Sequence, residues 1–475
     1  MYDNSKLHIV MFPWLAIGHQ IPFLELSKCL ASKGHHISFL STPRNIQKLS
    51  KIPQHLSTFI SLLTLPLTHV QNLPENAESS MDIPINKTQL LKKAFDGLKP
   101  HVSNFLQTSK TPINWIIYDY ASFWLPELAD AFTIPCVFFC LFSAAVLSFV
   151  GPPEVLLTSE EVRPTPEDFT VVPKWIPFHS DIVFRLHEML QYFEGAPSDI
   201  SDVPDTYRFG VAIRDCEFIA LRSCEEFEPE WISFLSKLNK KTVIPVGSLH
   251  PLAHVSAEAD DENWVRIRHW LDRKADSSVV YVALGTESIL THNQLNELAL
   301  GLERSGLPFF WVIRSPPESS SVDVLAMLPN GFQDRVNDRG VIWTSWAPQV
   351  EILAHRSVEG FLTHCGWNSV IEGLGYGRVP VMLPMLNDQG LNARLLTEKM
   401  LGIEIPRNER DGSFTSGSVA ESLRVAMVGK EGEVFRSNAR DMREVFGNTN
   451  EMHRYLDDFV GYFNHRLRER GTSIH

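Results

Sequence analysis

The stretch of residues 346–389 holds the side chains whose types and spacing could do chemistry. In its middle, the largely apolar residues 360–364 are expected to form a strand, and a turn with a glycine joins them to a helix expected over residues 367–374. The first N–H groups of a helix have no partner inside the helix, and the helix dipole favours negative charge at that end. Further donors around this point come from His364, Asn368 and Ser369. The sequence therefore predicts an anion site whose ligand is a phosphate or a diphosphate.

A second pair of side chains could move a proton. His19 lies at the end of a predicted loop, residues 13–19, and an imidazole with a pKa of about 6.5 can accept a proton at neutral pH. Asp119 lies at the end of an apolar run, residues 115–120, which is expected to be a buried strand. Ligands of a parallel sheet bind outside the carboxyl ends of its strands, so this carboxylate could bind the other ring nitrogen and stabilise an imidazolium. The alternative is that His19 only caps a helix.

Both groups need elements that carry them to the edge of a sheet. In each half of the chain, short apolar runs alternate with helical repeats, which is typical of a parallel sheet with helices on both faces. The expected strands are residues 7–12, 36–42, 115–120, 134–139, 216–223 and 243–247 in the first half, and residues 277–288, 308–314, 340–346, 360–364, 379–384 and 401–406 in the second. A polar linker, residues 248–263, would separate the halves, and residues 451–470 would form an amphipathic helix. We therefore expect two α/β domains.

Composition limits the class of protein. A chain of 475 residues is too long for one ordinary core, and 44% hydrophobic with 21% charged residues is typical of globular proteins. The formal charge of −13 disfavours nucleic acid and acidic membrane surfaces as partners. Six cysteines without C-x2-C spacing indicate reduced, buried thiols. The start has no signal-peptide pattern and the longest apolar run, residues 137–150, is too short to span a bilayer, so we expect a cytoplasmic protein with no membrane span.

The stretch 346–389 resembles the signature box of the plant secondary-product UDP-glycosyltransferases, family 1, in its length and in the order of its Trp, Gln, His, Asn-Ser, Glu and Asp-Gln residues. The sequence FPWLAIGH, residues 12–19, is similar to the members that begin FPWLA-x-GH, a group that includes enzymes extending the sugars of flavonoid and terpenoid glycosides. The resemblance implies the GT-B fold, in which two doubly wound Rossmann-like domains face each other across a cleft. Residues 1–250 would bind the acceptor, with the helix 451–470 closing that domain, and residues 251–450 would bind the UDP-sugar.

The resemblance also assigns roles to single residues. Those expected to bind uracil and ribose are Trp346, whose indole would stack on the base, Ala347, Gln349 and Glu372. Those expected to hold the diphosphate are Thr286, His364, Gly366, Asn368 and Ser369, and those expected to hold the sugar hydroxyls are Trp367, Asp388 and Gln389. His19 would take the proton of the acceptor hydroxyl while Asp119 orients its ring, and direct attack on C1 would invert the configuration. Taken singly, Trp367 could be a core residue, Glu372 a solvated helix residue and His364 a buried histidine.

The implied activity is that of an inverting O-glycosyltransferase that moves glucose from UDP-glucose to a hydroxyl of a small plant metabolite. The acceptor would be a flavonoid, a terpenoid, one of their glycosides or a xenobiotic. In this family a terminal Gln, here Gln389, usually accompanies glucose. Residues 385–387 are Met-Leu-Asn, where the family often has an aromatic and a small residue, so UDP-rhamnose and UDP-xylose stay open as donors.

The remaining expectations concern the acceptor, metals and alternatives. An apolar acceptor pocket would be lined by Trp14, Phe123, Phe142 and Phe184. The chain has no Asp-x-Asp motif, so an enzyme without metal or other cofactor is expected. We also expect a monomer. A catalytically silent nucleotide-sugar-binding protein is the alternative. A nicotinamide oxidoreductase is disfavoured, because the loop around Gly18 lacks the G-x-G-x-x-G sequence.

Overall fold

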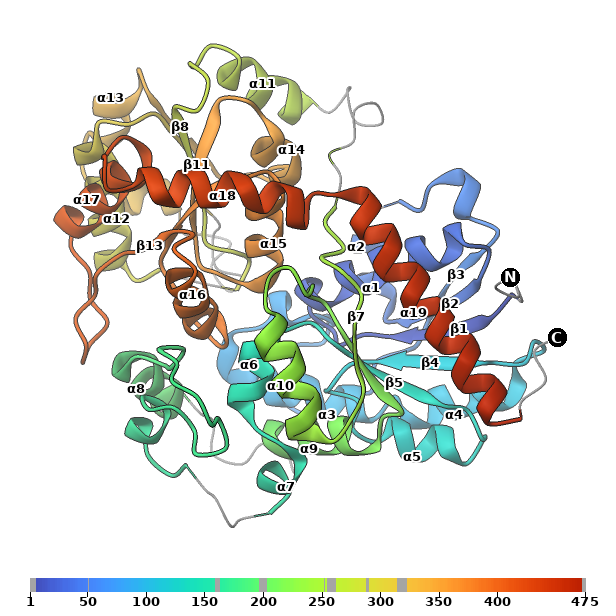
Figure 1. The fold of residues 1–475 in the computed structure, drawn as a ribbon. Helices are drawn as coiled ribbons and strands as arrows, with labels where there is room; N and C mark the ends of the chain where they lie inside the picture. Colours follow the sequence, from blue (N-terminus) through green and yellow to red (C-terminus); the bar gives the residue numbers. More distant parts are fainter. Residues whose placement is uncertain are drawn as a thin grey trace. The chain divides into compact units, whose positions relative to one another are not determined.

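The structure is a computed structural model that describes residues 6–49, 51–158, 163–195, 203–251, 253, 262–287, 290–313 and 323–471. The chain, drawn in Figure 1, forms two compact units. The first consists of Met1–Val162, Ala196–Leu249 and Thr449–His475, and the second of Arg163–Gly195 and His250–Asn448. Most of the expected linker lies outside the described residues.

The domain ranges expected from the sequence differ from these units in one segment. They place residues 163–195 in the first domain, whereas the structure groups this segment with the second unit. The physical reason is visible at its helix α8, Leu186–Gly195, where Glu188 forms an ion pair with Arg394 of the second unit at 2.7 Å. Pairs between residues this far apart in the chain cannot be read from local sequence.

The first unit contains one sheet of seven parallel strands in the order β3-β2-β1-β4-β5-β6-β7. Its strands are β1 His8–Phe12, β2 His36–Ser41, β3 Ile60–Thr64, β4 Trp115–Tyr118, β5 Cys136–Cys140, β6 Phe218–Leu221 and β7 Val243–Pro245. Every strand expected in this half is confirmed to within a few residues. The edge strand β3 was not expected, because only its first residue is buried and its sequence carries no clear apolar pattern.

Helices flank this sheet. They are α1 Ile17–Ser32, α2 Pro43–Lys48, α3 Thr88–Asp96, α4 Lys99–Thr108, α5 Leu125–Asp130, α6 Ala144–Val150, α7 Pro153–Leu156, α9 Asp205–Asp215, α10 Pro229–Asn239 and α19 Thr449–Glu469. The predicted amphipathic helix near the C-terminus is confirmed as α19, whose Phe459 and Phe463 are fully buried. The ring of Phe463 stacks on Trp115 of β4 with 4.8 Å between centroids. Since each such side chain contributes about 1.5–3 kcal/mol when buried, α19 is part of the core of this unit.

The second unit contains a sheet of six parallel strands in the order β10-β9-β8-β11-β12-β13. Its strands are β8 Val279–Ala283, β9 Phe309–Val312, β10 Gly340–Trp343, β11 Val358–Thr363, β12 Val379–Met382 and β13 Ile403–Glu404. Its helices are α8, α11 Glu262–Leu271, α12 His292–Ser305, α13 Phe332–Val336, α14 Gln349–Ala354, α15 Trp367–Gly375, α16 Gln389–Glu398, α17 Ser416–Met427 and α18 Glu433–Phe446. The sheet core includes Tyr281, which stacks on Phe361 at 5.3 Å. The expectation of two Rossmann-like α/β domains is confirmed.

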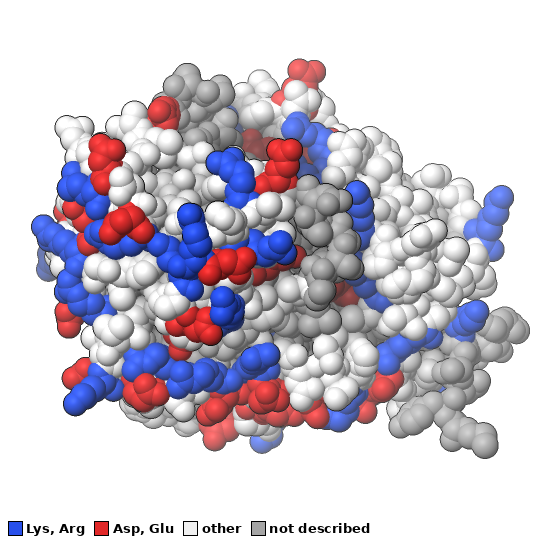
Figure 2. Space-filling view, turned by 90° about the horizontal axis from the view of Figure 1, so that it is seen from above, with Lys and Arg blue, Asp and Glu red and all other residues white. Residues whose placement is uncertain are grey.

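The surface and the cysteines add two observations. On the face that Figure 2 shows, basic and acidic side chains lie interspersed, so an anionic ligand would be held by local donors rather than by a field of one sign. All six cysteines are unpaired thiols, and five of them are buried. None of the helices in the described ranges combines the length and apolar character that crossing a bilayer requires. The expected cytoplasmic location stays a prediction.

Candidate active site

The predicted anion site is built where β11 passes into α15. Cys365, the second residue after the strand, has a φ of +66°, a left-handed conformation that turns the chain. Gly366 is the N-cap residue of α15, so no side chain of its own covers the helix N-terminus. The helix then begins at Trp367, as predicted. The strand, the turn and the helix that an anion site requires are therefore all present.

Two glycines make room for the imidazole of His364. A Cβ atom at Gly285, in the turn after β8, or at Gly366 would lie 2.6 Å from Nε2 of His364. Side chains do not approach one another this closely in a packed interior, so both positions need a residue without a side chain. Gly285 also has a φ of +77°, which other residues adopt only with strain. Because β8 and β11 are neighbours, His364 brings the turn that carries Thr286 against the start of α15.

His364 is in a charge state that allows it to act as a neutral hydrogen-bond donor. By surface area the residue is only half-buried, but protein atoms crowd the ring, and this burial lowers its pKa to about 4. The ring is therefore neutral at physiological pH and carries one N–H. Within the described part of the chain, its Nδ1 has no hydrogen-bond partner. A buried nitrogen without a protein partner suits a bond to a ligand, here an oxygen of the expected diphosphate.

The expected ribose carboxylate is held by a short network. Nε2 of Gln349 donates to Oε2 of Glu372 at 2.7 Å and to Oγ of Ser369 at 3.3 Å. The hydroxyl of Tyr281 donates to Oε1 of the same glutamine at 3.3 Å. Glu372 is 8% exposed and Gln349 is half-buried. The hydrogen bond from Gln349 therefore orients this carboxylate. Tyr281, in the middle of an apolar strand, gave no signal in the sequence.

Three other residues of the box differ in how they face a ligand. Trp346 is 62% exposed, which leaves its flat indole accessible for stacking on a base. Ala347 is buried, so a contact with the base would come through its backbone. The indole of Trp367 is 4% exposed and packs edge-on to the ring of Phe446 at 6.5 Å. Its indole is therefore buried, and its expected contact with sugar hydroxyls stays a prediction.

The end of the box is a tightly bonded turn. Oε1 of Gln389, the first residue of α16, accepts from the backbone N–H groups of Met385 at 2.9 Å and Leu386 at 2.8 Å. Its carbonyl thus closes the turn, and its amide group is the part that suits a sugar hydroxyl. Asn392 donates to Oδ2 of Asp388 at 2.7 Å and to the carbonyl of Cys365 at 3.0 Å. This asparagine, which sequence reasoning missed, ties the sugar turn to the anion site.

In the first unit, the predicted pair is in hydrogen-bond contact. Nδ1 of His19 lies 2.7 Å from Oδ2 of Asp119, and the backbone N–H of Trp14 donates to the same oxygen at 3.2 Å. The carboxylate is almost fully buried and the imidazole is 19% exposed. With Nδ1 bonded to the carboxylate, Nε2 is the nitrogen that could accept a proton from a substrate.

One expectation about His19 is wrong. It does not lie in a loop but in the first turn of α1, which starts at Ile17. The N-cap residue Ala16 has no side chain that caps the helix, and Pro22 lies inside it. The sequence therefore has neither an N-cap signal nor an uninterrupted helical pattern at this point.

Aromatic rings surround this pair. The rings of Tyr120 and Phe142 each lie 6.1 Å from that of His19. Phe209 of α9 stacks on Tyr120 at 4.1 Å and lies 5.6 Å from Phe142. Phe142 was predicted, whereas Tyr120 and Phe209 were missed, although Tyr120 follows Asp119 directly in the sequence. We call Tyr120, Phe142 and Phe209 the aromatic group.

The other predicted acceptor residues lie elsewhere. The ring of Trp14 is 3% exposed and packs edge-on to Phe95 at 5.2 Å. Phe123 contacts Tyr207 and lies 5.0 Å from the guanidinium carbon of Arg208. Phe184 belongs to the second unit, where its backbone N–H donates to the carbonyl of Phe169. Within the first unit, then, Phe142 lies beside His19, Trp14 contributes through its backbone, and Phe123 belongs to a separate cluster.

Across the described residues, no three His, Cys, Asp or Glu side chains gather as a metal site would require. The mechanism without a metal stays a prediction. The donors that could face a diphosphate are uncharged: the neutral His364, the hydroxyls of Thr286 and Ser369, and the start of α15.

Comparison with known proteins bears on the class of enzyme. The family model described as UDP-glucoronosyl and UDP-glucosyl transferase matches residues 249–443. UDP-glycosyltransferase 91C1 of Arabidopsis thaliana is 52% identical over 475 residues, which are 100% of this chain and 99% of the relative. Soyasaponin III rhamnosyltransferase of Glycine max is 40% identical over 96% of this chain and 95% of the relative. The structure of Phytolacca americana UGT2 complexed with UDP-2fluoro-glucose and pterostilbene is similar, with a TM-score of 0.74 at 25% identity over 96% of this chain and 100% of that one.

The family and the fold inferred from the residues are thereby confirmed. The similarity covers both units, and the family model lies on the part that carries the predicted UDP-sugar residues. The chain belongs to the plant family 1 UDP-glycosyltransferases, and it is a UDP-sugar-dependent glycosyltransferase with the GT-B fold.

Proposed function

We propose that the protein is an inverting O-glycosyltransferase that transfers glucose from UDP-glucose to a hydroxyl of a small plant metabolite. The observation that carries this proposal is the bond of 2.7 Å between Nδ1 of His19 and Oδ2 of Asp119. A histidine held by a buried carboxylate is a general base whose protonated form is stabilised, which an acceptor hydroxyl requires. A protein that only bound nucleotide sugars would have no use for such a pair.

The chemistry follows from the two sites. His19 takes the proton of the acceptor hydroxyl as its oxygen attacks C1 of the sugar, and Asp119 stabilises the imidazolium that forms. The bond between C1 and the diphosphate oxygen breaks, and UDP leaves with the electron pair. The start of α15 and the neutral N–H of His364 stabilise the charge that develops on the diphosphate. A single displacement of this kind inverts an α-linked donor to a β-glycoside.

Glucose is favoured by the resemblance to the family, in which a terminal Gln, here Gln389, usually accompanies this sugar. The carbonyl oxygen of Gln389 is used inside the turn, so its amide N–H groups are the part that suits sugar hydroxyls. The glucose derivative in the Phytolacca structure agrees with this choice. UDP-rhamnose and UDP-xylose remain the competing donors, and the soybean relative is named a rhamnosyltransferase.

The acceptor is proposed from the aromatic group beside His19. Stacked rings of Tyr120 and Phe209 next to Phe142 offer flat apolar surface, which suits a flavonoid, a terpenoid, one of their glycosides or an aromatic xenobiotic. The relatives fit this range, since one is named for a soyasaponin and the Phytolacca structure contains pterostilbene.

The test is a screen of the purified protein with UDP-glucose, UDP-rhamnose and UDP-xylose against aglycones and their glycosides. Product mass identifies the sugar, and the proton coupling at C1 in the NMR spectrum gives the anomeric configuration. We expect UDP-glucose to be the best donor and the product to be a β-glycoside. A higher kcat/KM with another donor would refute the glucose assignment, and retention of configuration would refute the direct displacement. UDP binding without any transfer would indicate the silent binder.

A further inference from the structure

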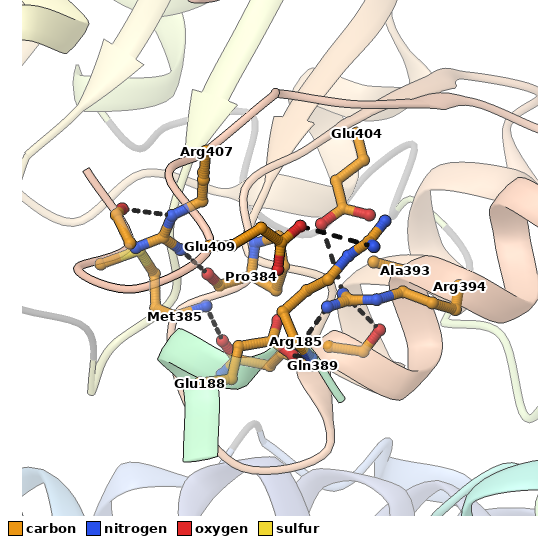
Figure 3. A network of polar contacts seen from close by, with 12 residues as sticks. Arg185, Glu188, Pro384, Met385, Gln389, Ala393, Arg394, Glu404, Arg407 and Glu409 are labelled. Atoms are coloured by element: carbon orange, nitrogen blue, oxygen red, sulfur yellow. Dashed lines mark hydrogen bonds and ion pairs between the residues drawn. The ribbon is translucent and has the colours of Figure 1, made fainter. Parts of the chain in front are cut away.

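The segment formed by Arg185 and the first turn of α8 reaches the predicted sugar site from a distant part of the sequence. Figure 3 shows Arg185 and Glu188 from this segment beside Gln389 and Arg394 of α16, within a network of charged side chains. We call residues 384–390, which lead into α16 and include the predicted sugar contacts, the sugar turn. Every residue of this network belongs to the second unit.

Two arginines hold the ends of the sugar turn. Arg407 donates to the carbonyl of Pro384, at its start. Arg394 donates through Nη1 to the carbonyl of Gly390, at its end, at 2.7 Å. The side chain of Gln389 closes the middle of the turn by accepting from two of its backbone N–H groups. The shape of the turn therefore depends on where these two guanidinium groups lie.

Glu188 fixes one of them. Nη2 of Arg394 donates to Oε2 of Glu188 at 2.7 Å, and the backbone N–H of Arg185 donates to the same oxygen at 2.7 Å. The side chains of Arg394 and Glu188 are 5% and 10% exposed, so the pair is shielded from water. Glu404 lies on the other side of Arg394, with 3.3 Å between Oε1 and Nη1. Removing the charge of one partner of a buried pair is costly, and the remaining ion is expected to move.

Glu188 also packs directly on the sugar turn. A Cβ atom at Gly390 would lie 2.5 Å from Oε2 of Glu188, so the carboxylate sits against the backbone of the turn and would have to move to admit a side chain there. Beside it, His187 is 5% exposed and packs in the same way against Gly412, whose carbonyl accepts from Nε of Arg407 at 2.6 Å. Glu188 and His187 thus both pack closely on backbone, which limits how far the side chains of Arg394 and Arg407 can move.

We propose that Glu188 is a positioning residue for the donor: through Arg394 it holds the sugar turn in the shape that selects the sugar of the UDP-sugar. This inference rests on the proposed function, which places the sugar hydroxyls at Asp388 and Gln389. The uracil, ribose and diphosphate are assigned to other residues, none of which bonds to Glu188 or Arg394 in the contacts described here. Loss of the Glu188 charge therefore lowers the contribution of the sugar to binding and leaves the affinity for UDP unchanged.

The experiment compares Glu188→Gln with the wild-type chain. Calorimetry gives the Kd of UDP alone and of UDP-glucose, UDP-rhamnose and UDP-xylose, which separates the sugar's contribution without requiring turnover. We expect the Kd of UDP to stay within about twofold, and the Kd of the preferred UDP-sugar to rise on the order of tenfold, as for residues coupled by direct contact. The ratios of kcat/KM among the three donors should shift in parallel. Glu303→Gln is the matched control, because Glu303 pairs with Arg335 at 2.6 Å at another place in the same unit.

A second variant keeps the charge and moves it. In Gly390→Ala the new methyl group displaces the Glu188 carboxylate, and the donor ratios should shift without loss of UDP affinity. Donor affinities that match those of Glu303→Gln in both variants would refute the proposal. A loss of UDP affinity equal to that of the UDP-sugar would also refute it, because it would mean a general structural role. Failure of the proposed function is distinct: the wild-type chain would then transfer no sugar, whatever the binding ratios of the variants.

Discussion

In the first unit, His19 already has its partner, the Asp119 carboxylate at 2.7 Å, whereas in the second unit His364 lies between two glycines and its Nδ1 has no partner among the described residues. Burial lowers the pKa of His364 to about 4, so it works as a neutral donor. A general base needs its orientation and its counter-charge before the substrate arrives. A group that only binds an anion needs no protein partner, because the ligand supplies the partner when it binds.

This difference predicts that variants at the two sites lose different properties. Damage to the His19 pair should reduce the rate of the chemical step while UDP-sugar still binds. Damage around His364 should reduce the affinity for UDP before it reduces anything else. Measurements that follow turnover and UDP binding side by side therefore test whether the two sites divide the work in this way.

The largest effect is expected at the base. His19→Ala should lower kcat by about 10²–10⁴-fold, because no other group would take the proton of the acceptor, while the Kd of the UDP-sugar stays close to that of the wild-type chain. Initial rates and calorimetry on the same preparation measure both quantities. His101→Ala, on the exposed face of α4, is the control for removing a histidine. Near-normal turnover in His19→Ala would remove His19 from the mechanism.

The next effect is expected at the glycine beside His364. Gly366 has a φ of −58°, so Gly366→Ala adds a methyl group without backbone strain, and that methyl would lie 2.6 Å from Nε2 of the imidazole. Overpacking of this kind costs about 1–3 kcal/mol, so the Kd of UDP should rise roughly 5- to 150-fold. Calorimetry with UDP measures it. Gly417→Ala is the control, because its new Cβ would meet nothing closer than Thr415 at 3.6 Å. An unchanged Kd would show that His364 does not touch the nucleotide.

A smaller effect is expected in the aromatic group. Phe209→Leu removes a ring that stacks on Tyr120 at 4.1 Å and leaves His19 in place. Such ring pairs contribute about 0.5–1.5 kcal/mol, so the KM of an aromatic acceptor should rise roughly 2- to 10-fold, with the KM of the donor unchanged. Steady-state kinetics with each substrate varied in turn separates the two constants. A rise in the donor KM alone would place Phe209 outside the acceptor site.

The residues that sequence reasoning found share one property: their position follows from local pattern. The strand, turn and helix around His364 are contiguous, so one stretch of sequence contained all of the anion site except the turn that carries Gly285 and Thr286. His19 and Asp119 are far apart in the chain, but each follows a strand of one parallel sheet, and strand ends meet at one edge. That rule was enough to pair them, even though the start of α1 was placed too late.

The residues that it missed depend on tertiary pairing. Asn392 ties Asp388 to Cys365, and Glu188 reaches Arg394 across the sequence, but neither pairing has a local pattern. Tyr120 joins Phe209 only because the turn after β4 meets α9 in the fold. Conversely, an aromatic residue in an apolar run, such as Trp367, has the same sequence pattern in a core as in a binding site. Burial, which shows whether such a ring is packed inside the unit, is a property of the fold.

The last effect, on stability rather than on activity, concerns two buried histidines, one in each unit, outside the proposed chemistry. Burial lowers the pKa of both His35 and His187 to about 4. Around His187 the nearby charges of Arg407, Arg394 and Arg185 lower it further, while Asp411 raises it. His35 accepts a hydrogen bond from the backbone N–H of Leu7 at 3.2 Å, whereas neither ring nitrogen of His187 has a partner among the described residues. His35→Asn and His187→Asn therefore form a matched pair of variants.

In both cases the pKa is lower in the folded than in the unfolded chain. Above about pH 6.5 both forms are neutral; as the pH falls towards 4, the unfolded chain binds a proton that the folded chain does not, so the free energy of unfolding decreases. Each imidazole accounts for at most about 3 kcal/mol of this loss. Either substitution should flatten the pH dependence over that range, as measured by urea unfolding at intervals from pH 7 to pH 4.5. In His35→Asn the lost bond to Leu7 should also lower stability at pH 7, which His187→Asn should not share. An unchanged slope in His187→Asn would mean that His187 charges inside the folded unit, with Asp411 outweighing the three arginines.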